Sequence, residues 1–254
     1  MNCCRSLILL SLVALFLAGC ETLPSSRVHA SIKQDPASRA LQQVVLMPVD
    51  VDVFEMSAGG IKEEVPEWSR IAQVNVRNAL LISAGSDGGC CVTRSIDSAT
   101  LTQDEQEMLE EHLALFNRVA ASALWTALPA NSAWHFKNTQ FDYTLGDGLS
   151  FLKTKYGLDG ALIVMGEDVV STAGRKATAL VGAVFGLVVP MGHSFLAAGL
   201  VDFTTGDLLW MNHELSGGDA DLRDGQSCRK LVVRLMRDYP VRQAATGDNR
   251  RTGN

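Results

Sequence analysis

Ala161-Leu162-Ile163-Val164-Met165 is an uninterrupted apolar run in the second half of the chain. A short run of this kind, bounded by glycine and polar residues, is typical of a strand that is buried on both faces. We therefore predict a central strand here. Glu167 and Asp168 follow closely, and we expect them at the end of that strand.

A second strand is predicted from Val44 to Val53. Its first half is continuously apolar and its second half alternates, as expected of a buried strand that emerges at its end. Pro48 lacks an N–H group and indicates an edge or a bulge. Asp50 and Asp52 share one face of this strand. We interpret them as solvated acids rather than a cation site, because no third ligand follows nearby.

A hairpin is predicted from Val201 to Trp210. Two apolar-rich arms flank Thr204-Thr205-Gly206-Asp207, and the glycine supplies the positive φ that a tight turn needs.

Four segments have helical patterns. Thr102 and Glu105 form a capping box at the start of the clearest helix. Its expected buried stripe is Leu109, Leu113, Phe116, Ala120 and Leu124. A helix over residues 67–82 places Trp68, Ile71, Val74 or Asn75, Asn78 and Ile82 at helical spacing. A short helix over 149–156 and a last amphipathic helix over 221–239, with Cys228, Leu231 and Leu235 facing inward, complete the set. Together these elements predict an α/β fold, with α+β as the alternative, in which helices flank a mixed sheet of about four to five strands in three layers.

The segment from Ala173 to Gly199 is unusually apolar. No charge interrupts residues 177–200, where His193 is the only titratable group. Three interpretations stay open: a helix buried against its own sheet, an interface in a homo-oligomer, and insertion into a membrane. Gly182 and Gly186 form a Gly-x-x-x-Gly pattern that permits close helix approach. The candidate interface residues are Gly182, Phe185, Gly186, Val189 and Pro190.

The chain begins with a secretory leader, which we assign to residues 1–19. Arg5 precedes an apolar core, and Leu17-Ala18-Gly19-Cys20 ends the leader. This ending resembles the lipobox of bacterial lipoproteins, which implies cleavage before Cys20 and acylation of its thiol and amine. Glu21 follows, and in enteric-type sorting a residue other than aspartate implies passage to the outer membrane.

The organisation that follows is a lipidated tether over 20–40, one α/β domain over 41–240 and a disordered tail over 241–254. About twenty flexible residues would reach roughly 25 Å, enough to hold the domain clear of the headgroups.

Composition excludes some functional classes. The formal charge is −6, or −7 once Arg5 leaves with the leader, and Lys and Arg are scattered, so nucleic acid is not an expected partner.

Three cysteines are left after the leader and Cys20 are set aside, namely Cys90, Cys91 and Cys228, and we expect them in an oxidising compartment. A disulfide from Cys90 or Cys91 to Cys228, with Cys91 as the chosen partner, and buried free thiols are the two alternatives. No spacing supports a metal site, and no cofactor motif is present.

Two motifs resemble parts of hydrolase active sites. Gly192-His193-Ser194 resembles the start of a nucleophile elbow, but Leu196 stands where the last glycine is needed. Glu167 and Asp168 form an acid pair of the kind that glycosidases use. His135, His193 and His213 are far apart in sequence. We therefore expect no catalytic residues.

The combined motifs resemble a known group. A lipobox leader precedes a Val-Val-x-Met-Pro strand, and Gly160 to Val164 is followed by Ser-Thr-Ala-Gly-Arg-Lys at 171–176 and by the strand and hairpin at 198–210. This pattern is similar to a family of proteobacterial outer-membrane lipoproteins and, more distantly, to the CsgG, LpoB, PelC and TolB-N-terminal group. The resemblance implies a three-layer α/β domain and a role in envelope assembly, export or enzyme activation.

The resulting functional expectation is a non-enzymatic outer-membrane lipoprotein that faces the periplasm. Acylated Cys20 would hold it in the bilayer, and the domain would bind an envelope protein or a peptidoglycan-associated partner, with homo-oligomers as one form. A subunit of an export channel and a hydrolase of cell-wall material or esters are the alternatives.

Overall fold

A computed structural model describes residues 26–34, 41–85, 92–127, 136–217 and 220–240. The predicted leader, Cys20 and the predicted tail lie outside these residues.

One mixed sheet of eight strands organises the chain, with β6 (Gly160–Ser171) at its centre. On one side β6 pairs antiparallel with β7 (His193–Asp202). On the other side it pairs parallel with two strands in succession, β2 (Val44–Leu46) and β3 (Asp50–Met56). The predicted single strand from Val44 to Val53 is therefore two strands, and Pro48 lies in the break between them, as its missing N–H group predicts.

The central strand is longer than predicted. β6 runs to Ser171 because β3 and β7 pair with its second half. Glu167 and Asp168 are consequently inside the strand rather than at its end. Since neighbouring side chains in a strand point to opposite faces, these two carboxylates also face away from each other.

The predicted hairpin is confirmed as the connection between β7 and β8 (Leu208–Gly217). Gly206 has a φ of +72°, and a Cβ added there would lie 2.0 Å from the carbonyl oxygen of Gly146. Both the backbone conformation and the close approach therefore require glycine.

The short strands lie at the margins of the sheet. β4 (Lys62–Glu64) pairs with β3, and β5 (Val92–Ser95) pairs with β2. Together with β1 (Arg27–Val28), they bring the number of strands above the predicted four to five.

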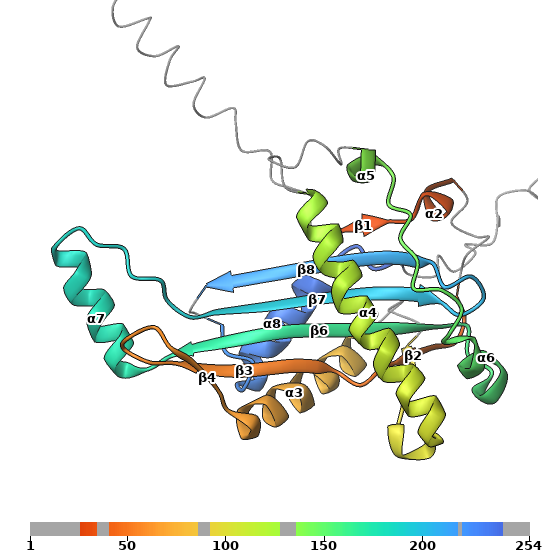
Figure 1. The fold of residues 1–254 in the computed structure, drawn as a ribbon, viewed down its shortest axis with the longest axis horizontal. Coiled ribbons are helices and arrows are strands. Elements are labelled where there is room, and N and C mark those ends of the chain that lie inside the picture. The colour runs from red at the N-terminus through yellow and green to blue at the C-terminus, as the bar shows by residue number, and fades with distance from the viewer. Residues whose placement is uncertain (1–25, 35–40, 86–91, 128–135, 218–219, 241–254) are drawn as a thin grey trace, which may run out of the picture.

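Helices cover both faces of the sheet and make three layers, as predicted (Figure 1). α3 (Pro66–Gly85) and α8 (Gly225–Leu235) pack on one face, around Val51, Val164 and Leu231. α4 (Gln103–Ala127) crosses the other face and encloses a second core with Phe116. The remaining helical turns are α2 (Ala30–Gln34), η1 (Ser98–Thr100), α5 (Phe136–Thr139) and α6 (Ser150–Tyr156).

The capping box of α4 is confirmed. The amide of Thr102 donates to Glu105 Oε2 at 2.8 Å, and the amide of Glu105 donates to Thr102 Oγ1 at 3.3 Å. Leu109, Phe116 and Ala120 of the predicted stripe are buried. Leu113 and Leu124 are partly buried against the same core.

The residues predicted at helical spacing in α3 are divided between core and solvent, and Trp68 packs against the core. Ile71, Val74 and Ile82 are exposed by 39%, 45% and 53%, whereas the buried side chains of this helix include Ala72, Val76, Ala79 and Leu80. These residues form the face of α3 that packs against β3 and α8.

The predicted flexible tether is partly folded. Residues 27–28 form β1, which extends the sheet antiparallel to β8 at Met211 and Trp210. Ser26 Oγ accepts a hydrogen bond of 3.1 Å from Trp210 Nε1, and the amide of His29 donates to the carbonyl of Leu209 at 2.8 Å. Ile32 of α2 packs against the core. Residues 26–34 of the predicted tether are therefore part of the folded domain.

Candidate functional site

The predicted apolar segment forms α7 (Ala173–Val184), a helix that projects beyond the end of the sheet (Figure 1). Thr172 is its N-cap, and the Thr172 Oγ1 accepts a hydrogen bond of 3.1 Å from the amide of Arg175. The chain then returns to the sheet and enters β7 at His193.

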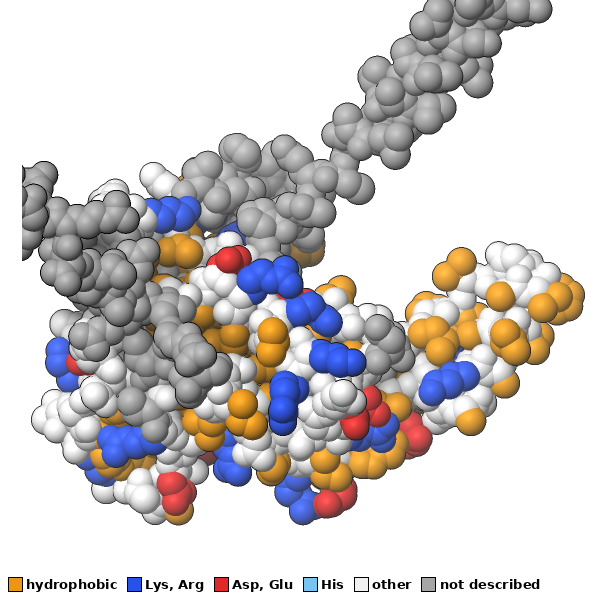
Figure 2. Space-filling view, turned by 180° about the vertical axis from the view of Figure 1, so that it is seen from behind, with side chains coloured by type: hydrophobic (Ala, Val, Ile, Leu, Met, Phe, Trp, Pro, Cys, Tyr) orange, Lys and Arg blue, Asp and Glu red, His pale blue; other side chains and the backbone are white. Residues whose placement is uncertain are grey.

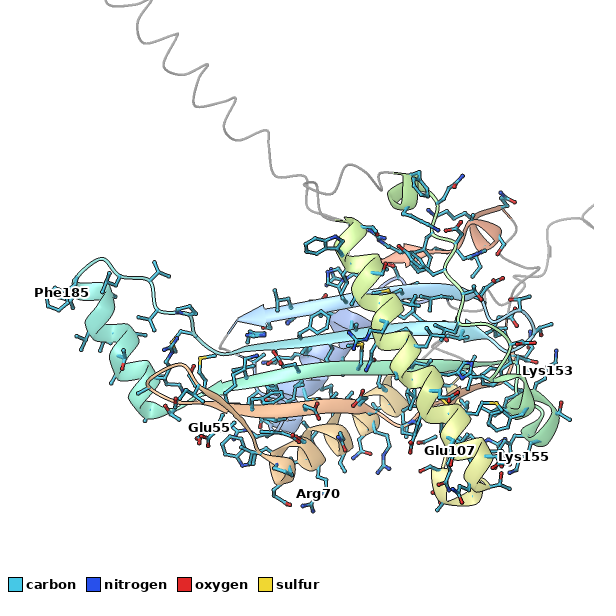
Figure 3. All side chains as sticks on the ribbon, in the orientation of Figure 1. Glu55, Arg70, Glu107, Lys153, Lys155 and Phe185 are labelled. Carbon is cyan, nitrogen blue, oxygen red and sulfur yellow. The ribbon has the colours of Figure 1, made fainter. Side chains whose placement is uncertain are left out.

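The outer end of α7 carries a cluster of exposed apolar side chains, which we call the apolar tip. Its exposed fractions range from 59% at Val181 to 94% at Val188. Figure 2 shows these side chains on a lobe that stands clear of the body of the domain, and Figure 3 labels Phe185 at its extremity. The members of the tip are Leu180, Val181, Val184, Phe185, Leu187 and Val188.

The expectation that this segment is a helix buried against its own sheet is therefore wrong. Only Gly182 of α7 is buried. The sheet ends before the helix begins, so among the described residues it does not cover the tip side chains. None of the helices in the described ranges is both long and apolar enough to cross a membrane.

The turn at the tip closes on itself. The carbonyl of Gly182 accepts hydrogen bonds from the amides of Phe185 and Leu187, each at 2.9 Å, and the amide of Gly186 donates to Ala183 at 3.1 Å. Gly186 has a φ of +71°, the left-handed conformation that commonly ends a helix. The amides of Phe185, Gly186 and Leu187 are therefore paired within the turn.

Gly182 has a different role from the one that its Gly-x-x-x-Gly pattern suggests. A Cβ at this position would lie 3.0 Å from Val189 Cγ2, so Gly182 lets the returning chain pack on α7. Of the five candidate interface residues, Phe185 and Gly186 are exposed at the tip, whereas Gly182 and Val189 pack against each other.

Arg175 braces the base of α7. Its guanidinium donates to the carbonyl of Pro190 from Nε at 3.1 Å and from Nη2 at 2.9 Å, and Nη1 donates to the carbonyl of Ala58 at 3.2 Å. Three segments, namely α7, the return to β7 and the turn between β3 and β4, are thereby joined by one side chain. Pro190, the remaining candidate interface residue, is thus part of the brace.

Beside α7, the sheet face that α4 crosses is open at its far end (Figure 1). Phe54, Phe195 and His213 are half-buried there, and Leu215 is exposed by 65%. Glu167 Oε1 accepts from Lys62 Nζ at 2.8 Å and lies 3.1 Å from His193 Nε2. This open sheet patch combines apolar side chains with a shared carboxylate.

The acids at the start of β3 lie next to this patch. Asp50 Oδ2 accepts a hydrogen bond from Asn117 at 3.0 Å. Burial raises the pKa of Asp52, and the carboxylates of Asp50, Glu64 and Glu167 raise it further. In the part of the chain that the structure describes, no group of three or more His, Cys, Asp or Glu side chains is placed to hold a metal ion.

The candidate hydrolytic residues are divided between the two faces of the sheet. Ser194 is buried, and its Oγ donates to Asp168 Oδ1 at 2.7 Å rather than to a histidine. Asp168 Oδ2 accepts from the amide of Leu222 at 2.8 Å. Burial raises the pKa of Asp168, and these two hydrogen bonds act against that rise. His193 and Glu167 are on the opposite face of the sheet, and His135 lies outside the described residues.

Only one cysteine of the predicted disulfide, Cys228, lies in the described residues. Cys228 is a buried free thiol on α8, and burial raises its pKa to about 12. Cys91 and Cys90 lie outside the described residues, so the pairing stays a prediction.

No family model matches the chain, and no curated protein matches it in sequence. Among solved structures, the PelC dodecamer from Paraburkholderia phytofirmans superposes with a TM-score of 0.31 and 9% identity, over 78% of this chain and 88% of that chain. A single-residue variant of that dodecamer superposes with a TM-score of 0.31 and 10% identity, over 77% and 87%. These values are too low to assign the chain to a family or to transfer a function.

Proposed function

We propose that this protein is a lipid-anchored envelope lipoprotein that acts as a non-catalytic accessory module. It binds other envelope components through the end of the domain that carries α7. The observation that carries the proposal is the apolar tip, where six large or branched apolar side chains are each more than half exposed. Contiguous exposed apolar surface of this kind marks interaction sites in folded proteins.

The cost of leaving the tip bare supports this assignment. Full burial of one Val, Leu or Phe side chain is worth about 1.5–3 kcal/mol, so a tip without a partner forgoes a large part of the stabilisation that its residues offer. The brace from Arg175 to Pro190 and Ala58 holds the tip away from the sheet. A surface that is both apolar and held outward is suited to capture a partner.

The membrane anchor rests on the sequence. The lipobox Leu17-Ala18-Gly19-Cys20 follows a short apolar core that begins after Arg5, as in secreted lipoproteins. Two or more acyl chains convert reversible membrane binding into stable attachment. The non-catalytic part of the proposal is supported by the pairing of Ser194 with Asp168 in the core and by the position of His193, which contacts Glu167 on the opposite face of the sheet.

Photocrosslinking in cells tests the proposal. A photoreactive amino acid replaces Val188 at the tip in the full-length protein, and a matched control replaces Val233, which is exposed by 58% on α8. We expect adducts with envelope components from position 188 and few from position 233. Adducts with a second copy would identify a homo-oligomer, and adducts with an export protein would identify the channel alternative.

Equal yields at both positions would contradict a binding role for the tip. Hydrolysis of peptidoglycan or of ester substrates by the wild type, lost in Ser194→Ala or Glu167→Gln, would contradict the non-catalytic assignment.

A further inference from the structure

We infer that the apolar tip is seated in the same bilayer leaflet that holds the lipid on Cys20, so that the protein contacts the membrane at two separate places. This inference rests on the proposed lipid anchor. It names the occupant of the tip, which the proposed function leaves open.

The first argument is the length of chain between the anchor and the folded domain. Ser26 is hydrogen-bonded to Trp210, and Arg27 already pairs with Met211 of β8. Five residues lie between Cys20 and Ser26, which makes six steps from one Cα to the next. A fully extended chain spans at most about 3.3–3.6 Å per residue, so the β1 edge of the domain cannot lie further than about 20 Å from the acylated cysteine. The anchor therefore keeps the domain at the membrane surface.

The position of α7 agrees with this placement. β1 extends the sheet beyond β8. In Figure 1, α7 rises from the level of β3 and β6 towards the level of β8, so its tip lies on the side of the sheet to which β1 is attached. One membrane surface along this side can receive both the anchor and the tip.

The composition of the tip suits hydrocarbon. No charged or titratable side chain occurs from Ala177 to Gly192. Charged side chains in the bilayer interior are costly, and this stretch carries none. Arg175 and the exposed Lys176 lie at the base of the helix, where cations meet lipid phosphates.

The length of α7 limits insertion to one leaflet. From Lys176 to Val184 the helix rises about 12 Å at 1.5 Å per residue. Half of a hydrocarbon core of about 30 Å is about 15 Å. With Lys176 at the headgroups, the tip therefore reaches into the near leaflet without crossing it.

Three amide groups at the tip are already paired, which favours entry into a bilayer. Unpaired N–H and C=O groups are expensive in hydrocarbon. The amides of Phe185, Gly186 and Leu187 all donate within the closing turn. The turn can therefore enter lipid without leaving these donors unsatisfied.

Fluorescence quenching in vesicles tests the inference. Full-length lipidated Val188→Trp protein is reconstituted into phosphatidylethanolamine and phosphatidylglycerol vesicles, some of which carry bromine on the acyl chains. Lipidated Val233→Trp is the matched control, and the unmodified protein gives the background of its own four tryptophans. We expect a loss of fluorescence from the introduced tryptophan in Val188→Trp and none in Val233→Trp. Equal signals from the two variants would overturn the inference.

A second measurement distinguishes failure of the membrane inference from failure of the proposed function. Incorporation of labelled palmitate into the wild type, absent in Cys20→Ala, establishes the anchor independently of the tip. Labelled Cys20 with an unquenched Val188→Trp variant overturns the membrane seat alone and leaves a protein as the occupant of the tip. Absence of label overturns the anchor, and with it the inference.

Discussion

Arg175 donates two hydrogen bonds to the single carbonyl oxygen of Pro190, at 3.1 Å from Nε and 2.9 Å from Nη2. These residues are fifteen positions apart, one at the start of α7 and the other on the chain that returns from its tip. The pair closes the base of the projecting unit. It explains how a short apolar helix stays in one orientation without a sheet beneath it.

Replacement of Arg175 by alanine is expected to loosen the tip. It removes three hydrogen bonds, and we expect faster amide exchange over residues 186–192, with a loss of about 1–2 kcal/mol in the free energy of unfolding. Hydrogen exchange by mass spectrometry and urea unfolding measure the two effects. Lys176→Ala, at the neighbouring exposed position, should change neither; unchanged exchange in Arg175→Ala would show that the brace is not needed.

Gly192→Ala is expected to destabilise the domain strongly. A Cβ at Gly192 would lie 1.9 Å from the carbonyl oxygen of Val169, and the Gly192 amide donates to Ser171 Oγ at 2.9 Å. We expect a loss of about 3 kcal/mol, the upper end of the usual range for overpacking. Gly217→Ala is the matched control, because Gly217 pairs with His193 and a Cβ there meets nothing within 4 Å. Similar thermal unfolding midpoints for the two variants would contradict the prediction.

Asp168 is expected to make stability depend on pH. Burial raises its pKa in the folded state, so the folded protein binds a proton that the unfolded protein has released. This contribution is fully present below the ordinary aspartate value and is lost as the pH rises through the folded pKa. Asp168→Asn removes the titration. The free energy of unfolding of this variant, relative to the wild type, should therefore improve from about pH 4 to about pH 7.

The serine that binds Asp168 provides the control. Ser194→Ala keeps the carboxyl but removes a hydrogen bond that lowers its pKa, so the loss of stability with rising pH should be steeper than in the wild type. A relative stability of Asp168→Asn that stays constant or falls over this range would count against the assignment.

Cys228 is expected to be inert in the folded protein. Its pKa of about 12 leaves almost no thiolate at neutral pH, and the side chain is buried. Iodoacetamide should therefore label the Cys228 peptide only after unfolding, without any reductant. Labelling that requires a reductant would instead reveal the disulfide with Cys91 or Cys90.

Elements with a local cause were predictable. The capping box of Thr102 and Glu105, the glycine turn at Gly206 and the break at Pro48 each depend on side chains and backbone groups a few residues apart. Contacts between residues a few positions apart can be predicted from local sequence patterns. The central strand at 161–165 was predictable for a related reason, since a short apolar run bounded by glycine and polar residues is typical of a strand buried on both faces.

Contacts between elements that are far apart in the sequence were not predictable. α3 has two apolar stripes, and the sequence favoured the one with the larger side chains, Ile71, Val74 and Ile82. The fold buries Ala72, Val76, Ala79 and Leu80 instead, because this is the face of α3 that meets β3 and α8. The folding of residues 26–34 was missed as well, because a two-residue strand forms only where β8 presents a free edge.

The sequence by itself determined the apolar character of residues 177–192 and the alternation of strands and helices, and the predicted leader with its lipobox rests on it alone. Each of these depends on composition and on periods of a few residues. Only the tertiary structure decided that the apolar tip is exposed. Whether Leu180, Val184 and Phe185 are covered depends on what surface lies beside them, and in this fold the sheet ends before α7 begins.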